Sequence, residues 1–273
     1  MSTETQIHIG TSAFTAAGWP GSFYPAGLKP AEYLSYYATK FSSVELDNTF
    51  YRTPALSTVK GWYAKTPPNF VFAAKVPQVI THEKVLVDCA ADLAEFLTAM
   101  DALGEKLGAL LFQFGYFNSS AFKSQSDFLD RLKPFLKSLP SGYRFAVEIR
   151  NKWWLDARLT DLFREHGVAL ALIDQSWVPR PWEMKRNLDL VTADFSYIRW
   201  LGDRKEIESL TMSWDKIVVD RTADLNRWAE IARTLIHQRK LQHLFLFANN
   251  HYAGHGPATV QQFLSMDVLG RQM

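Results

Sequence analysis

Charged residues of both signs follow apolar runs in this sequence, where they could perform acid–base chemistry on an anion. They are Lys75, Arg150, Arg199, Glu45, Glu148 and Asp174. A guanidinium group offers a bidentate fork to a carboxylate or phosphate, and an ammonium group offers a point charge. A carboxyl group whose pKa is raised toward neutrality by burial can transfer a proton. These residue types therefore indicate a site that binds an anion and moves protons.

Within this set we expect Glu148, the first choice, and Glu45 to act as general acid and base. Lys75 is the third catalytic candidate, and it could form a Schiff base if apolar surroundings lower its pKa. The expected ligand-binding residues are Arg150, Arg199, Asn48, Tyr51, Trp153, Asp174, Asn249, Asn250 and His251. The aromatic rings among them would stack on a sugar ring or a nucleobase, or would simply cover the core.

Short apolar runs separated by helical patterns must position these residues. Runs typical of buried strands occupy residues 6–11, 43–46, 70–75, 108–114, 144–149, 168–173, 196–200 and 241–248. Helical patterns occupy residues 30–40, 57–65, 89–107, 124–139, 159–165, 224–239 and 258–265. A loop at 177–189, which contains Pro179 and Pro181, stands where the helix after the sixth strand would be, and residues 200–218 form another long excursion.

Eight strands alternating with helices favour an α/β fold, a (β/α)8 TIM barrel that forms a single domain over residues 1–273. An open doubly wound sheet is the alternative, but its glycine-rich turn G-x-G-x-x-G should follow the first strand, where this chain reads GTSAFTAAGWPG. Ligand sites of TIM barrels lie at the carboxyl ends of the strands. The barrel would therefore bring the polar residues at these ends to one mouth.

Strand side chains alternate between the two faces of a sheet, so residue parity predicts which charges face the barrel interior. Glu148 and Arg150 share a face opposite Ile149, and the same reasoning turns Lys75 and Arg199 inward. Three cations at one mouth favour an anionic ligand. The alternative is that the charges form an ion-pair network that plugs the barrel.

The composition limits the class of partner. Lys and Arg number 30 against 28 for Asp and Glu, a net charge of +2, which does not favour binding to nucleic acid or to a membrane surface. No segment has the roughly 20 uninterrupted apolar residues of a membrane helix, and the start lacks a secretion signal. Cys89 is the sole cysteine, which excludes an internal disulfide and fits a reducing compartment. We expect a cytoplasmic protein.

Two other functions remain open at this point. Aromatic rings over a basic mouth could stack on the bases of a nucleic acid or on a damaged base. Carboxylates at several strand ends, together with His251, could instead hold a divalent ion in a metal-dependent isomerase or nuclease. We predict no cofactor, keep the divalent metal as an alternative, and leave the oligomeric state open.

Several ordered segments resemble a known family over nearly the whole chain. They are IHIGTSAF, GWPGSFYP, FSSVELDNTFYRTP, FVFAAKVP, ITH, LLFQF, FAVEIRNKWW and FANNHYAGHGP. The chain resembles the YecE-like family, a domain of unknown function (72), and the resemblance implies a TIM barrel with a site at the strand ends. The residues that match its motifs are Glu45, Asn48, Tyr51, Lys75, Glu148, Arg150, Trp153, Asn249 and Asn250. Asp47 departs from the family pattern and carries less weight.

The sequence therefore predicts an enzyme that acts by general acid–base chemistry on a small anionic substrate, phosphorylated or sugar-like, at the carboxyl end of a TIM barrel. The resemblance brings no reaction. Isomerisation, lyase chemistry and hydrolysis all remain open.

Overall fold

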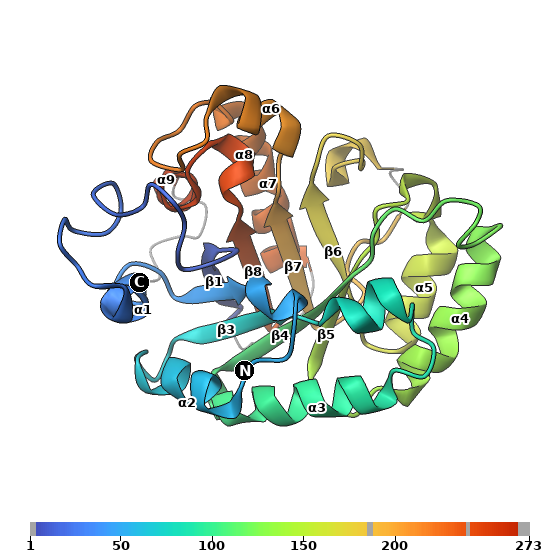
Figure 1. Cartoon of the computed structure of the whole chain (residues 1–273). Coiled ribbons are helices and arrows are strands. Elements are labelled where there is room, and N and C mark those ends of the chain that lie inside the picture. The colour runs from blue at the N-terminus through green and yellow to red at the C-terminus, as the bar shows by residue number, and fades with distance from the viewer. Residues whose placement is uncertain (1–3, 185–187, 239–240, 267–273) are drawn as a thin grey trace.

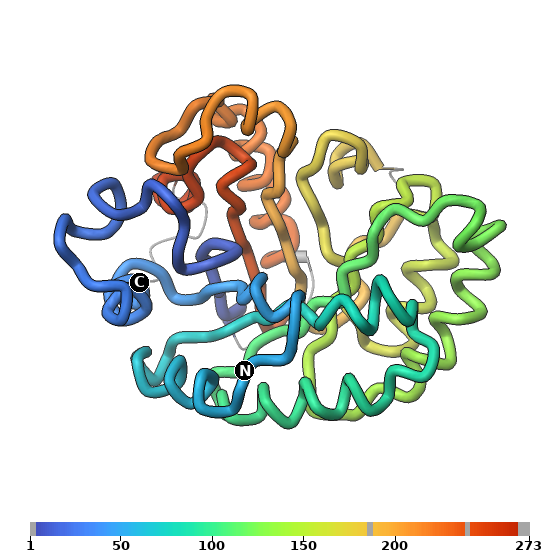
Figure 2. The backbone as a smooth tube through the Cα atoms, in the orientation of Figure 1, coloured from blue at the N-terminus to red at the C-terminus, as the bar shows by residue number. Residues whose placement is uncertain are grey.

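The computed structural model describes residues 4–184, 188–238 and 241–266, within which eight parallel strands form a nearly closed barrel (Figure 1). The strands are β1 (Gln6–Thr11), β2 (Ser43–Leu46), β3 (Val71–Lys75), β4 (Leu107–Gln113), β5 (Arg144–Glu148), β6 (Ala169–Asp174), β7 (Phe195–Trp200) and β8 (His243–Ala248). Figure 2 shows the backbone returning so that the last strand lies beside the first, in parallel register. The TIM-barrel prediction is confirmed, and each expected strand lies within two residues of its observed bounds.

Helices lie between and around the strands. They are α1 (Tyr33–Tyr37), α2 (Leu56–Ala64), α3 (Ala90–Met100), α4 (Gln125–Ser138), α5 (Ala157–Glu165), α6 (Arg204–Leu210), α7 (Thr222–Gln238), α8 (Asn250–Ala253) and α9 (Gly256–Leu264). In Figure 1, α2 and α3 run along the lower edge of the barrel and α4 and α5 cover its right side. Among the described residues, no helix has both the length and the apolar character needed to span a membrane.

The helix predictions hold for position and are wrong in detail at four places. The expected helix 30–40 is a 3-10 turn (Pro30–Glu32) followed by α1, and the expected helix 89–107 becomes 3-10 at Asp101–Lys106. The described part of the loop after β6 contains a 3-10 turn (Pro181–Glu183) and no regular helix, as expected. Residues 185–187 of this loop, and Arg239 at the expected end of another helix, lie outside the described residues. Helices α6 and α8 were missed. Asp203 caps the start of α6, and its carboxylate accepts hydrogen bonds from Lys205 N and Glu206 N.

The barrel interior is filled by small side chains on one half and by aromatic rings on the other. The interior cluster comprises Ala73, Ala109, Leu111, Ala146, Ala169, Ala171, Phe195, Tyr197, Phe245 and Phe247. Rings from β7 and β8 therefore fill the space that the alanines of β3, β5 and β6 leave open. The neighbouring residues in each strand, such as Val147, pack outward against the helices. The expected alternation is confirmed for β5.

A tyrosine completes the barrel where β1 meets β2, because these two strands form no ladder within the described part of the chain. The buried Tyr37 hydroxyl accepts a hydrogen bond from Thr11 N at 2.7 Å and donates one to Ser43 O at 3.2 Å. Gly10 permits the close approach, since a Cβ atom there would lie 1.8 Å from Ser43 O. Side-chain hydrogen bonds thus replace backbone pairing at this seam.

The opposite end of the barrel contains a chain of three side chains, His8, Arg144 and His243, which we call the basal cluster. Arg144 Nη2 lies 2.7 Å from His243 Nε2, and His243 Nδ1 lies 3.0 Å from His8 Nε2. Because a guanidinium group can only donate, His243 must accept at Nε2 and carry its proton on Nδ1, which then donates to His8. This arrangement requires both imidazoles to be neutral.

The basal cluster predicts that the protein loses stability in acid. Burial, with His243 and Arg144, lowers the pKa of His8 from its ordinary 6.5 to about 3. The unfolded chain therefore binds a proton that the folded one does not, so stability is complete above pH 6.5 and falls as the pH drops toward 3. We expect His8→Gln to reduce this loss by roughly 1.4 kcal/mol per pH unit. Urea unfolding of the wild type and of His8→Gln at a series of pH values measures this difference. If the free energies of unfolding of the two proteins fell in parallel with pH, His8 would not be the cause of the loss.

Candidate functional site

Three strands bring a buried ion-pair network to the carboxyl end of the barrel. Arg199 of β7 lies between Glu45 of β2 and Glu148 of β5, with Nη2 at 2.8 Å from Glu45 Oε1 and Nη1 at 2.5 Å from Glu148 Oε2. The Tyr197 hydroxyl donates to Glu45 Oε2 at 2.6 Å. The two carboxylates are fully buried, and Arg199 is 2% exposed. We call Glu45, Glu148, Tyr197 and Arg199 the buried network.

The buried network keeps Glu148 ionised. Burial alone would raise the pKa of Glu148, but the guanidinium groups of Arg199 and Arg150 together lower it to about 2. The expectation that burial raises this pKa toward neutrality is therefore wrong, because two cations outweigh the loss of solvation. The same carboxylates hold the pKa of Arg199 well above its ordinary value despite its burial. In this arrangement Glu148 is a permanent negative charge.

Three more charges lie above the network, and we call them the rim charges: Asp47, Lys75 and Arg150. Lys75 Nζ is 3.3 Å from Asp47 Oδ1, and Arg150 Nε donates to Glu148 Oε1 at 2.9 Å. Their side chains are 37%, 9% and 24% exposed, in that order. Network and rim together hold three cations and three carboxylates, so the formal charges of these six side chains cancel. Asp47, which carried little weight in the sequence, belongs to the site.

His82 also lies at the mouth, and the sequence reasoning missed it. It belongs to a π-helical turn (Val79–Glu83) after β3, and its Nδ1 lies 2.8 Å from Thr81 Oγ1. Gly115 leaves room beside Nε2, since a Cβ atom there would lie 3.3 Å away. Burial, with Lys75 and Arg150, lowers the pKa of His82. The ITH segment was the only sequence signal, and π-helical turns often occur at functional sites.

Asp174 lies outside the barrel, contrary to its expected place in the mouth. Ile173 takes the inward position at the end of β6, so the next side chain points toward the helices. The Asp174 carboxylate accepts hydrogen bonds from Arg180 Nε and Trp228 Nε1, both at 2.7 Å, and from the Tyr252 hydroxyl. Its contacts therefore join β6 to the surrounding helices.

The asparagines after β8 hold the backbone of that loop. Asn249 Oδ1 accepts from His251 N at 3.0 Å and caps α8, while Asn250 Oδ1 accepts from Gly256 N and from Trp19 Nε1. His251 Nε2 lies 3.2 Å from Glu208 Oε1. The polar side-chain atoms of these three expected ligand-binding residues thus form hydrogen bonds to nearby loops and helices. Within the described part of the chain, none of the three is hydrogen-bonded to the buried network.

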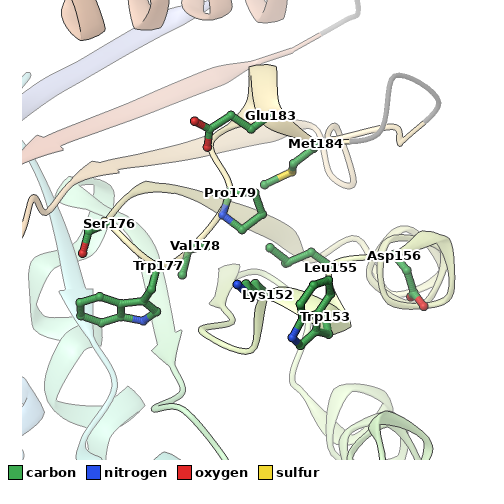
Figure 3. Close-up of a pocket in the computed structure, with 10 residues that line it drawn as sticks. All are labelled: Lys152, Trp153, Leu155, Asp156, Ser176, Trp177, Val178, Pro179, Glu183 and Met184. Carbon is green, nitrogen blue, oxygen red and sulfur yellow. The ribbon is translucent and has the colours of Figure 1, made fainter.

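Asn48, Tyr51 and Trp153 lie on the loops around the mouth. Asn48 lines a cavity of about 440 Å³ after β2, together with Arg52 and Glu95. Tyr51 is 73% exposed. Trp153 lines a separate cavity of about 550 Å³ over the ends of β5 and β6 (Figure 3). Asn48 and Trp153 therefore lie in two separate cavities beside the charged mouth, and neither cavity is lined by Asp174 or by the residues after β8.

The geometry can position an anion and can transfer protons through groups other than the buried carboxylates. Arg150 is bonded through Nε, and within residues 4–184, 188–238 and 241–266 no group pairs with its two terminal nitrogens. Over the same ranges, no three His, Cys, Asp or Glu side chains form a cluster that could hold a metal ion.

The buried network predicts that Glu148→Gln destabilises the fold, because the variant leaves Arg199 with one carboxylate fewer in the interior. The expected loss is about 3–5 kcal/mol in the free energy of unfolding. Asp161→Asn is the control; its pair with Arg164, at 2.7 Å on the surface of α5, should contribute at most about 1 kcal/mol. Urea unfolding at neutral pH measures the free energy of unfolding of both variants. Equal losses would show that the ion pairs of the buried network stabilise the fold no more than a surface pair does.

Comparisons with known proteins agree with this fold. A family model described as a protein of unknown function, DUF72, matches residues 8–272. The UPF0759 protein YecE of Escherichia coli (strain K12) is 33% identical over 118 residues, which are 43% of this chain and 41% of that protein. The matched segment thus spans less than half of the curated relative.

Two solved structures resemble the whole chain. A DUF72 family protein from Thermotoga maritima MSB8 is 27% identical, with a TM-score of 0.73 over 96% of this chain and 98% of that one. Another from Enterococcus faecalis V583 is 20% identical, with a TM-score of 0.67 and the same coverage. The resemblance found in the sequence is confirmed: with a family match that extends from residue 8 to residue 272, the chain belongs to the DUF72 family.

Proposed function

We propose that this protein is an enzyme that binds a small anionic substrate at the rim charges. The observation that carries the proposal is the position of Arg150. Its Nε donates to Glu148, and its guanidinium group is partly exposed at the mouth. Because the buried Glu148 carboxylate fixes one edge of this planar guanidinium group, the two terminal nitrogens are well ordered for bidentate contact with a carboxylate or phosphate. Arg199, by contrast, is enclosed by its two carboxylates and would act only as support.

Lys75 and His82 are the groups we propose for proton transfer, in place of Glu148 and Glu45. Burial lowers the pKa of Lys75, and Asp47 offsets only part of the shift. The pKa of His82 is lowered by burial and by Lys75, so its imidazole is neutral near pH 7 and can accept a proton. Glu45, bound by Arg199 and Tyr197, would share the supporting role of Glu148.

The charge balance favours a small ligand over a nucleic acid. Three carboxylates accompany three cations at the mouth, so the six residues create no extended positive surface for a phosphate backbone. A compact anion needs only the local fork of Arg150 and the ammonium group of Lys75.

The first test of this function is ligand binding. Inorganic phosphate and small carboxylic acids should raise the melting temperature of the wild type, because a ligand at 100 times its Kd adds about 2.7 kcal/mol of stability. We expect Arg150→Gln to abolish this increase. Lys133→Gln, which removes an exposed cation from α4, is the control and should leave it intact. An increase that survives in Arg150→Gln would exclude the rim charges as the anion site.

The second test is turnover. Anions that stabilise the wild type are incubated with it, and their conversion is followed by NMR. We expect His82→Gln to bind the converted anion with similar affinity and to lower kcat by about 100-fold or more, the usual contribution of a general acid or base. His237→Gln, which alters an exposed imidazole on α7, is the matched control. Unchanged kcat in His82→Gln would remove the imidazole from the mechanism.

A further inference from the structure

A cavity of about 550 Å³ opens between the loop after β5 and the loop after β6. Figure 3 shows its lining side chains coming from these two loops, with Trp153 and Lys152 on one and Trp177, Ser176 and Glu183 on the other. Its volume lies within the roughly 300–1,000 Å³ typical of small-molecule sites. The charges of the buried network and of the rim do not line it.

Two tryptophans of this cavity present their rings to solvent. Trp153 is 81% exposed and Trp177 is 46% exposed. The adjacent Trp154 shows the contrast, because it stacks on Phe128 at 5.0 Å between ring centroids and packs against the core. The fold therefore uses the second tryptophan of the pair for packing, whereas the first leaves a large apolar face uncovered. A ligand that covers this ring removes apolar surface from water, which favours binding.

Polar groups surround these rings without a large net charge. Lys152 Nζ lies 4.8 Å from the centre of the Trp153 ring and can donate hydrogen bonds. The Glu183 carboxylate, 44% exposed, can accept them, and Ser176 keeps an acceptor site while its hydroxyl donates to Asp203. Asp156, also in the lining, is paired with Arg158 at 2.9 Å. A ligand that suits this wall is uncharged, carries hydroxyl groups and has one apolar face.

We propose that this cavity binds a sugar ring. A pyranose has an apolar C–H face that can lie on an indole by dispersion and a hydroxyl edge that can bond to Lys152 and Glu183. A phosphorylated ligand would find Arg158 and Arg180 already paired with Asp156 and Glu183, at 2.9 Å and 3.4 Å, so these two cations are engaged by carboxylates of the protein. The mixture of flat rings, one ammonium group and carboxylates therefore fits a neutral sugar better than a nucleotide.

This inference does not depend on the proposed function. Lys75, Glu148 and Arg150 are absent from the cavity lining, so anion binding at the mouth and sugar binding in the cavity can succeed or fail separately. The two tests use different ligands and different variants.

A titration of the full-length protein with neutral pyranoses tests the proposal. The probes are methyl glucosides, methyl galactosides and N-acetylglucosamine, followed by tryptophan fluorescence and by NMR of the indole N–H groups. We expect saturable binding of at least one of them, weakened about tenfold or more by Trp153→Ala and by Trp177→Ala. Trp153→Phe keeps a flat ring and should recover part of the affinity. Tyr116→Ala, which removes a 68% exposed ring outside the cavity, should bind like the wild type.

Melting curves of each variant confirm that it is folded, which is expected because Trp153 and Trp177 are exposed. The absence of binding by every sugar, or equal weakening in Tyr116→Ala, would overturn the proposal. Binding of adenosine at the two tryptophans with no response to sugars would assign the cavity to a nucleobase and overturn it as well. Loss of affinity confined to the two tryptophan variants supports it.

Discussion

The ion pairs between Arg199 and two buried carboxylates constrain the rest of this structure. Glu45 and Glu148 have no exposed surface, and each charge would cost several kcal/mol in the interior without a cation beside it. Arg199 contacts both, so it ties β7 to β2 and β5 across the barrel. Because these groups satisfy one another, they close the floor of the mouth. The ligand that we propose would therefore contact the layer above, which contains Lys75 and Arg150.

The part of the site that could be predicted from sequence follows from local geometry. Parity within a strand depends only on the chain itself, so the inward positions of Glu148 and Lys75 could be inferred from their neighbours. The same rule, applied from Leu170 and Leu172, places Asp174 on the outer face, where the structure has it. Asp174 was expected in the mouth because it ends the strand, but the alternation of side chains along β6 places it on the outer face.

The remaining features depend on residues far apart in the chain. Arg199, which lowers the pKa of Glu148 together with the nearby Arg150, is 51 residues away, and no local pattern reveals that contact. His82 lies in a π-helical turn, whose period matches neither the helix nor the strand pattern. Trp153 and Trp154 are chemically identical neighbours, yet one is exposed and the other packs on Phe128; only the tertiary structure distinguishes them.

The loop after β5 connects the floor, the rim and the cavity within a few residues. It follows Glu148 of the buried network, carries Arg150 at the rim and then Trp153 at the cavity. β5 pairs with β4 over five residues but with β6 over only two, and β6 continues beyond Leu170, its last residue paired with β5, to Asp174 before its own loop begins. Because β4 pairs with β5 from one side and Arg199 binds its carboxyl end, the register of this strand positions one residue of each proposed site, Arg150 at the rim and Trp153 at the cavity.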